Sequence, residues 1–354
     1  MSTTGVIFSP IFYRHNPGRG HPESARRLRA IVRELKKSKL QGVENWEFVE
    51  PERARLEDVE LIHGIEYIEF VENLCRLGGD ILDVEGDTVA SPESFEVALY
   101  AVGGTLKAVN LVMEEKFQNA FALVRPPGHH AGKHLACGFC IFNNIAVAAK
   151  YLLKKFKLKR ILVLDIDAHH GNGTQEIFYE TNKVLYISLH EDPRRFPRAG
   201  FIDEIGEGKG FGYNVNVPLP FRTNDQIYLK AVNEIVKPII QQYNPQFVLV
   251  SAGLDGHYTD PVGSLSLSSL CYQEVYETIV NLASEICGGK LVSVLEGGYS
   301  LNFIGKIAVA AVAKMSEALY SIEDEVPMTK KRVKEQGEKV IKEVKRVQKA
   351  FWKI

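Results

Sequence analysis

The sequence predicts an α/β protein built on a mostly parallel sheet with helices on both faces. Short apolar runs that are typical of buried parallel strands alternate with longer stretches of helical periodicity. Clusters of His, Asp and Tyr follow the apolar runs, as they do at the carboxyl edge of a doubly wound sheet. With 354 residues, 45% of them hydrophobic and 25% charged, the chain can bury a substantial core.

The expected elements alternate along most of the chain. Five apolar runs ending in small or polar residues are expected to be strands, at 121–130, 161–171, 184–191, 247–256 and 291–300. Helical spacing predicts helices at 145–156, 226–243, 270–286 and 303–320. No internal repeat is visible, so we expect residues 1–323 to form a single domain.

Residues 324–354 differ in composition and are expected to be an appendage to that domain. Between 325 and 354, ten Lys or Arg stand against four Glu, and apolar residues recur at helical spacing, at Val333, Val340, Val344, Val347, Phe351 and Ile354. This pattern predicts a basic amphipathic helix. We expect it to pack on its own domain; a contact between subunits of a homo-oligomer comes next, and binding to an acidic surface last.

Charge and cysteine content exclude several classes of protein. The 43 basic and 44 acidic residues give a formal charge of -1, which predicts no nucleic-acid partner for the main domain. Five scattered cysteines and an N-terminus without a basic start and long apolar stretch predict a reduced, cytoplasmic protein. No apolar run approaches the roughly 18 residues that span a bilayer, so no membrane association is expected.

The segment 165–170 is the most informative for chemistry. Because side chains alternate along an extended chain, Asp165, Asp167 and His169 leave the strand end on one side. A carboxylate and an imidazole suit zinc or ferrous iron, and a carboxylate from Asp255 would complete a site open to water. Either motif alone is more often a polar strand end, but burying several such groups together is costly without a cation or dense hydrogen bonding.

Two further strand ends carry reactive side chains. In RPPGHH, prolines and a glycine stiffen a turn that holds His129 and His130 side by side, so one can accept a proton while the other donates one. The alternative is a surface loop with two histidines. In EGGY, glycines allow close backbone approach, and Tyr299 could donate to an oxyanion, although most of the 14 tyrosines must be structural.

The motifs RPPGHH, GFC-x-FNN, D-x-D-x-HH-G-N-G-T, SAG-x-D and EGGY occur in the order and approximate spacing of the zinc-dependent histone deacetylase family. HPESARRLRAI at 21–31 also resembles the family's N-terminal H-P-E motif. The match spans nearly the whole chain before the basic tail, so the sequence is identified as a member of this family. The resemblance implies the arginase/deacetylase fold and a deacetylase or deacylase that hydrolyses an N-acyl amide of a lysine-like or other amine.

The resemblance also implies the metal site. It makes Asp167, His169 and Asp255 the ligands of one Zn²⁺ per chain, and Fe²⁺ is an alternative because it uses the same ligand types. The segment Cys137-Gly-Phe-Cys140 has no second cysteine pair, and its Gly-Phe belongs to a family motif, so we do not expect it to bind metal.

The catalytic residues follow by the same resemblance. His129 and His130 are the implied general acid/base pair, and Tyr299 is the implied donor to the substrate carbonyl. Asp165 is expected to orient His129. Asn172 stands behind His130, where class II-like members carry asparagine and others aspartate, so the chain leans toward class II.

Substrate and potassium contacts are implied as well. A narrow channel for an acyl-lysine-like chain should be lined by Gly138, Phe139, Phe196, Val262 and Gly298. Structural K⁺ is expected at two sites, one formed by Asp165, Asp167, His169, Ser188 and Leu189, the other by Phe178, Thr181, Val184 and Tyr213.

Two departures from the family pattern affect the substrate. Phe196-Pro-Arg-Ala-Gly replaces the commoner F-P-G-T-G, which alters the rim near Arg198. Val262 stands where polyamine-selective relatives place a glutamate, which mildly disfavours acetylpolyamines.

Three alternative functions stay open at this point. An acetylpolyamine or small acyl-amine amidohydrolase would use the same residues. A binuclear manganese hydrolase of the arginase type needs bridging carboxylates that D-x-D-x-H-H does not provide. A catalytically silent acyl-lysine-binding or partner-binding protein is disfavoured because His129, His130 and Tyr299 are all retained.

Overall fold

The computed structural model describes residues 4–38 and 45–354. Its strands are β1 (Thr4–Ile7), β2 (Trp46–Val49), β3 (Asn119–Ala122), β4 (Ile161–Asp165), β5 (Val184–Glu191), β6 (Asn214–Leu219), β7 (Phe247–Ala252) and β8 (Leu291–Leu295). They form one sheet in the order β2-β1-β3-β8-β7-β4-β5-β6, with every neighbouring pair parallel. The predicted parallel α/β sheet is confirmed, and all carboxyl ends meet at one edge.

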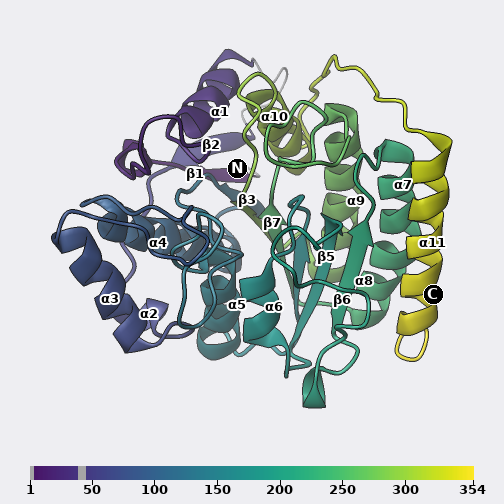
Figure 1. The fold of residues 1–354 in the computed structure, drawn as a ribbon, viewed down its shortest axis with the longest axis horizontal. Helices are drawn as coiled ribbons and strands as arrows, with labels where there is room; N and C mark the ends of the chain where they lie inside the picture. The colour runs from purple at the N-terminus through teal and green to yellow at the C-terminus, as the bar shows by residue number, and fades with distance from the viewer. Residues whose placement is uncertain (1–3, 39–44) are drawn as a thin grey trace.

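Helices cover both faces of this sheet (Figure 1). One face holds α4 (Ser94–Met113), α5 (Asn144–Lys155) and α6 (Asn172–Phe178), with α2 (Leu56–Val59) and α3 (Ile65–Arg76) packed against α4. The other holds α1 (Arg26–Lys37), α7 (Asp225–Ala231), the π-helical η3 (Val232–Val236), α8 (Lys237–Tyr243), α9 (Ser269–Cys287), α10 (Ile304–Met315) and α11 (Lys331–Gln348). Two short 3-10 turns, η1 (Pro10–Tyr13) and η2 (Gly208–Gly210), lie in loops.

The five predicted strands exist, but most end earlier than predicted. β3 ends at Ala122 and β4 at Asp165, so RPPGHH and most of the D-x-D-x-H-H motif lie in the loops beyond them. Strands β1, β2 and β6 were not predicted. The predicted helix at 226–243 is three consecutive segments, α7, η3 and α8.

Helix α4 is the central helix of its face and was not predicted. It packs on β1, β3, β8 and α5, and most of its residues are buried. Within the ranges 4–38 and 45–354, it is the one helix long and apolar enough to cross a membrane by length and composition. However, 78% of that apolar window is buried inside the fold, as in a core helix.

The basic tail forms helix α11, which packs along β6 and α7 of the same chain. Ile341, Val344 and Trp352 are buried there. The Trp352 indole N–H donates to the carbonyl of Gly212 at 2.9 Å, and the Gln348 amide donates to the carbonyl of Asn214 at 3.1 Å. The apolar side of the helix is therefore covered by its own domain. A contact between subunits through the remaining basic side stays a prediction.

Candidate active site

Two buried carboxylates and an imidazole converge at the carboxyl ends of β4 and β7. These strands are neighbours, with Asp165 opposite Ser251, so the loops that follow them lie together. His169 Nδ1 lies 2.9 Å from Asp255 Oδ2 and 3.3 Å from Asp167 Oδ1. One ligand atom from each of Asp167, His169 and Asp255 lies within 4.8 Å of the others. The structure thus brings the predicted metal ligands together.

The chemistry of this cluster fits a divalent cation. Burial and the nearby charge of Asp167 raise the pKa of Asp255 to about 7. Burial also opposes the charge on Asp167, but the imidazoles of His129 and His169 outweigh it and hold the pKa of Asp167 below its usual range. A bound cation would relieve the repulsion between these carboxylates, and the ligand set of one imidazole and two carboxylates suits zinc.

Two glycines allow the backbone to approach the cluster. A Cβ at Gly253 would lie 2.1 Å from Asp167 Oδ2, and a Cβ at Gly297 would lie 2.6 Å from Oδ2 of both Asp167 and Asp255. The Gly297 N–H donates to Asp167 Oδ2 at 2.8 Å. Only glycine fits at these positions, so the EGG motif serves to orient the carboxylate of Asp167, one of the predicted ligands.

The adjacent histidines lie beside the cluster with different partners behind them. His129 Nδ1 is 3.0 Å from Asp165 Oδ2, and His130 Nδ1 is 2.8 Å from Asn172 Oδ1. The two ring centroids are 4.0 Å apart, and His129 Nε2 is 3.8 Å from Asp167 Oδ2. The predicted partners Asp165 and Asn172 are therefore both in place, with Asp165 also accepting from the Tyr186 hydroxyl at 3.0 Å.

These partners separate the basicities of the two imidazoles. Burial lowers the pKa of His129, but the carboxylates of Asp165 and Asp167 outweigh it and raise the pKa to about 10. Burial and the charge of His129 hold the pKa of His130 well below its usual range. A pair of titratable groups whose pKa values are driven apart is suited to acid/base chemistry.

Glu296 supports the histidine turn and was not singled out from the sequence. Its Oε2 accepts from the backbone N–H groups of Gly128 at 2.7 Å and His129 at 3.2 Å. Burial raises its pKa to about 7. His129, Glu296 and Cys140 also lie close enough together to hold a metal. However, burial raises the pKa of the Cys140 thiol well above its usual range, which disfavours the thiolate a metal needs.

Tyr299 is fixed from several directions. Its N–H donates to Asp260 Oδ2 at 2.6 Å, and its ring stacks edge-on with Phe139 at 5.9 Å. The guanidinium of Arg27 lies 4.9 Å from the ring centroid. Arg27 is fully buried and donates to the carbonyls of Gly298, at 2.6 Å, and Glu296. Arg27 was not predicted as a site residue, although the H-P-E segment contains it.

The phenol, both histidines, Asp167 and His169 line one cavity of about 280 Å³. Its walls include four of the five predicted channel residues, Gly138, Phe139, Phe196 and Val262. The fifth, Gly298, lies outside the lining, and Gly297 lines the cavity instead. A Cβ at Gly138 would lie 2.5 Å from the His130 ring, so a side chain there would collide with the pair. The rim also includes Glu85, Asp87 and Arg195.

Some residues of the two predicted potassium sites are neighbours in the structure. Asp165 at the end of β4 is in register with Ser188 of β5, beside Leu189, and Asp167 and His169 follow in the next loop. In the second group, the N–H of Thr181 donates to the carbonyl of Phe178 at 3.2 Å. Val184 begins β5, and the Tyr213 carbonyl accepts from the Tyr186 N–H at 3.0 Å.

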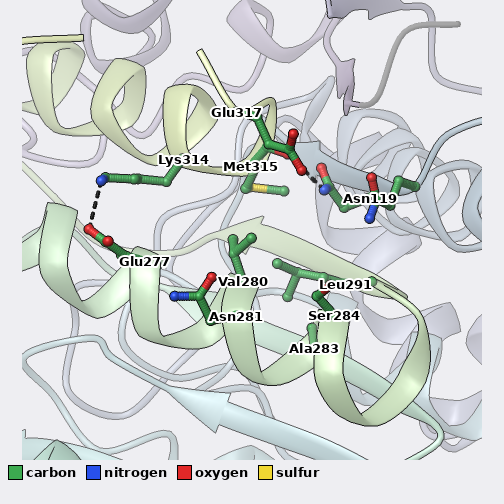
Figure 2. Close-up of a pocket in the computed structure, with 12 residues that line it drawn as sticks. Asn119, Glu277, Val280, Asn281, Ala283, Ser284, Leu291, Lys314, Met315 and Glu317 are labelled. Atoms are coloured by element: carbon green, nitrogen blue, oxygen red, sulfur yellow. Dashed lines mark hydrogen bonds and ion pairs between the residues drawn. The ribbon is translucent and has the colours of Figure 1, made fainter. Parts of the chain in front are cut away.

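A different cavity lies at the opposite, amino-terminal edge of the sheet, between α9 and α10 (Figure 2). Asn119 and Leu291, the first residues of β3 and β8, line it. Its volume is about 260 Å³, and Lys314 pairs with Glu277 at 2.6 Å within it. None of the predicted catalytic residues lines this cavity.

Comparisons with known proteins identify the family of the chain. A family model described as "Histone deacetylase domain" matches residues 21–315. A "Probable deacetylase" from Archaeoglobus fulgidus is 40% identical over 360 residues, covering 99% of each chain. A "Probable deacetylase" from Methanothermobacter thermautotrophicus is 38% identical over 323 residues, covering 91% of this chain and 93% of that protein.

Among solved structures, the "HDA15 HD domain" superposes with a TM-score of 0.88 at 32% identity, covering 99% of this chain and 95% of that chain. The fold is thus the arginase/deacetylase fold that the sequence predicts. The motifs, the arrangement of the site and these similarities lead to one conclusion: this chain belongs to the histone deacetylase family.

Proposed function

We propose that this protein is a zinc-dependent deacetylase that hydrolyses the N-acyl amide of a lysine-like amine. The supporting observation is a cavity lined by two unequal imidazoles, a phenol, Asp167 and His169, with Asp255 completing the ligand cluster beside it. Asp167, His169 and Asp255 would hold the ion, and ferrous iron could replace zinc in the same ligand set.

When bound, the ion supplies Lewis acidity to a water molecule and to the amide carbonyl. The Nε2 atoms of His129 and His130 are available for proton transfer because their Nδ1 atoms face Asp165 and Asn172. One imidazole accepts a proton from water and the other donates one to the leaving nitrogen. The Tyr299 hydroxyl donates to the carbonyl oxygen as negative charge develops on it.

The aromatic walls select the shape of the substrate. Phe139 and Phe196 line the cavity and present apolar faces to a slender alkyl chain, and Gly138 keeps the space beside His130 open. Val262 at the rim provides no charge for a substrate cation. We therefore favour an acyl-lysine-like substrate over an acetylpolyamine.

Replacing the phenol tests the proposal. In zinc-loaded protein, Tyr299→Phe should lower kcat for an acetyl-lysine peptide by roughly 10²- to 10³-fold, because one donor to the oxyanion is lost. Tyr151→Phe is the matched control, since the Tyr151 hydroxyl bonds Asn110 away from the cavity. Acetate release from acetyl-lysine peptides, acetylpolyamines and small acetylated amines measures the effect.

The outcomes separate enzyme from binding protein. Turnover by the wild type that Tyr299→Phe abolishes and Tyr151→Phe retains supports a deacetylase. If zinc binds stoichiometrically but no acyl substrate is hydrolysed, the enzyme proposal fails and a silent acyl-lysine-binding protein takes its place.

Two secondary assignments belong to the same proposal. The five cysteines all have free thiols, which suits the reducing cytoplasm. Potassium ions are proposed at the two groups of residues described above, where they would stabilise the loops that carry Asp167 and His169.

A further inference from the structure

A basic cavity adjoins the mouth of the active-site cavity. It has a volume of about 590 Å³ and lies between the loops after β5, β6 and β7 and the segment leading into α11. Arg195 lines both cavities, and the neighbouring residues Val262 and Gly263 line one each. The two cavities are therefore neighbours that share the side chain of Arg195.

Three cations line this cavity, and no acid does. They are Arg195, Arg222 and Lys330. Within residues 4–38 and 45–354, none of the three has a carboxylate partner among the ion pairs of the structure. The active-site cavity, by contrast, includes Glu85 and Asp87 in its lining. The lining of the basic cavity therefore favours an anion more than the lining of the active-site cavity does.

The cationic side is held in a defined geometry. Arg222 has φ of 63°, which an arginine rarely adopts, and this backbone is fixed at both ends. Its N–H donates to the Ser264 carbonyl at 2.8 Å, and its carbonyl accepts from the Thr329 hydroxyl at 3.0 Å. The guanidinium of Arg195 lies 4.9 Å from the ring centroid of Phe221, a cation–π contact.

The segment that supplies Lys330 is also fixed. Asp324 accepts from the N–H of Ser269 at 2.6 Å, and its carboxylate lies 2.9 Å from His257 Nε2. The Thr329 hydroxyl anchors the other end of the segment on Arg222. A strained backbone held by several bonds is typical of ligand-binding positions.

We propose that this cavity binds an acidic group, a carboxylate or phosphate, carried by the amine half of the substrate. The inference rests on the proposed deacetylase function. The orientation of the substrate in the channel supports it. The acyl amide must reach His129, His130 and Tyr299, and the alkyl chain passes Phe139 and Phe196. What emerges beside Arg195 is the remainder of the amine, so an anion there meets three unpaired cations.

Matched substrates test the inference. One arm compares an acetyl-lysine peptide with aspartate next to the acetyl-lysine against the same peptide with asparagine. A second arm compares Nε-acetyl-lysine with a free α-carboxylate against its α-amide, which separates a terminal carboxylate from a side-chain acid. A third arm compares an acetyl-lysine peptide that contains phosphoserine with the same peptide that contains serine. We expect kcat/KM to favour the anionic member of at least one pair about fivefold, mainly through KM, because an exposed ion pair contributes at most about that factor.

Variants locate the effect. In Arg222→Gln the anionic-to-neutral ratio of kcat/KM should fall toward one, whereas Arg222→Lys should retain most of it. Lys209→Gln is the control, since Lys209 lies in a separate cavity lined by Lys150, Lys154 and Lys183. Raising the salt concentration should also reduce the ratio in the wild type.

The failures are distinguishable. If no member of any pair is hydrolysed by zinc-loaded wild type, the proposed function itself fails. If the pairs are hydrolysed at equal rates, or if Arg222→Gln keeps the preference, the deacetylase stands and the anion-binding cavity is refuted.

Discussion

At the scale of single residues, a buried ion network behind Tyr299 connects the N-terminal segment to the active site. Glu23 accepts from Arg125 at 2.5 and 2.7 Å and from Arg27 at 2.9 Å, and all three side chains are fully buried. Arg125 also donates to the carbonyl of Phe12 at 2.7 Å. Since Arg27 bonds the carbonyl of Gly298, this network sets the position of the EGGY turn and hence of the phenol.

The network should be sensitive to loss of its carboxylate. Glu23→Gln leaves two buried guanidinium groups without a counter-charge, so we expect the free energy of unfolding to fall by about 3–5 kcal/mol. Chemical denaturation measures it. Glu93→Gln is the control, because the Arg14–Glu93 pair is exposed and should contribute less than about 1 kcal/mol. If Glu23→Gln and Glu93→Gln lower the free energy of unfolding by the same amount, the buried network does not contribute more than an exposed ion pair.

The same carboxylate gives a pH dependence of stability. Burial opposes the charge on Glu23, but the guanidinium of Arg125 outweighs it and holds the pKa well below the usual 4.5. Because the folded-state pKa is depressed, the stabilisation is present above pH 4.5 and is lost as the pH falls through the lower folded-state value. The difference in unfolding free energy between wild type and Glu23→Gln should therefore shrink below pH 4.5. A difference independent of pH would argue against this linkage.

Much of the site could be predicted from motifs because its residues follow strands closely. Local sequence motifs identify the metal-ligand candidates and the adjacent histidines, namely Asp167, His169, Asp255, His129 and His130. The roles of Arg27 and Glu296 could not be predicted this way, because Arg27 acts on a carbonyl 271 residues away. Burial of a charged side chain depends on packing between distant segments, which local spacing does not reveal.

At the scale of elements, the missed strand β6 shows where periodicity fails. Its sequence NVNVPL contains asparagine and proline, which are rare in strands, yet it is buried. The side-chain N–H groups of Asn214 and Asn216 both donate to Gln175 Oε1 at 2.8 Å, which satisfies these buried donors. By contrast, the amphipathic pattern of α11 was sufficient to predict a helix. The helix packs on the domain through its apolar side, and the spacing of apolar residues along the sequence shows that side.

The packing of α11 can be tested at its anchor. Trp352 is 8% exposed and donates its indole N–H to Gly212. Trp352→Ala should lower the free energy of unfolding by about 3–5 kcal/mol through the cavity that it leaves. Leu319→Ala, at a side chain that is 83% exposed, should change it little. If urea denaturation gives the two variants the same stability, α11 contributes nothing to the fold.

At the scale of the whole molecule, the cluster of Asp167, His169 and Asp255 joins the loops of two strands that are neighbours in the sheet but distant in the sequence. The order of strands cannot be read from the sequence, because it depends on which strands pair across long separations. A parallel sheet was predictable; the adjacency of β4 and β7, on which the site depends, was not.

An ion that binds only the folded protein should stabilise the whole molecule. At free zinc a hundredfold above Kd, the gain is about 2.7 kcal/mol, so chelation should lower the melting temperature and added zinc should restore it. In Asp255→Asn the chelator should have a much smaller effect. If metal analysis shows that the chelator has removed all zinc but the melting temperature does not change, zinc binding does not stabilise the fold.

Strand β8 lies between β3 and β7 and is the last strand in the chain. Until residues 291–295 leave the ribosome, the strands β2-β1-β3 and β7-β4-β5-β6 have no strand to join them, and each group exposes an unpaired edge. The nascent chain must keep these two edges from pairing with other chains until β8 has been made. Completion of the sheet is therefore a late event in biogenesis, and a chaperone that shields open strand edges would help this protein most before β8 is made.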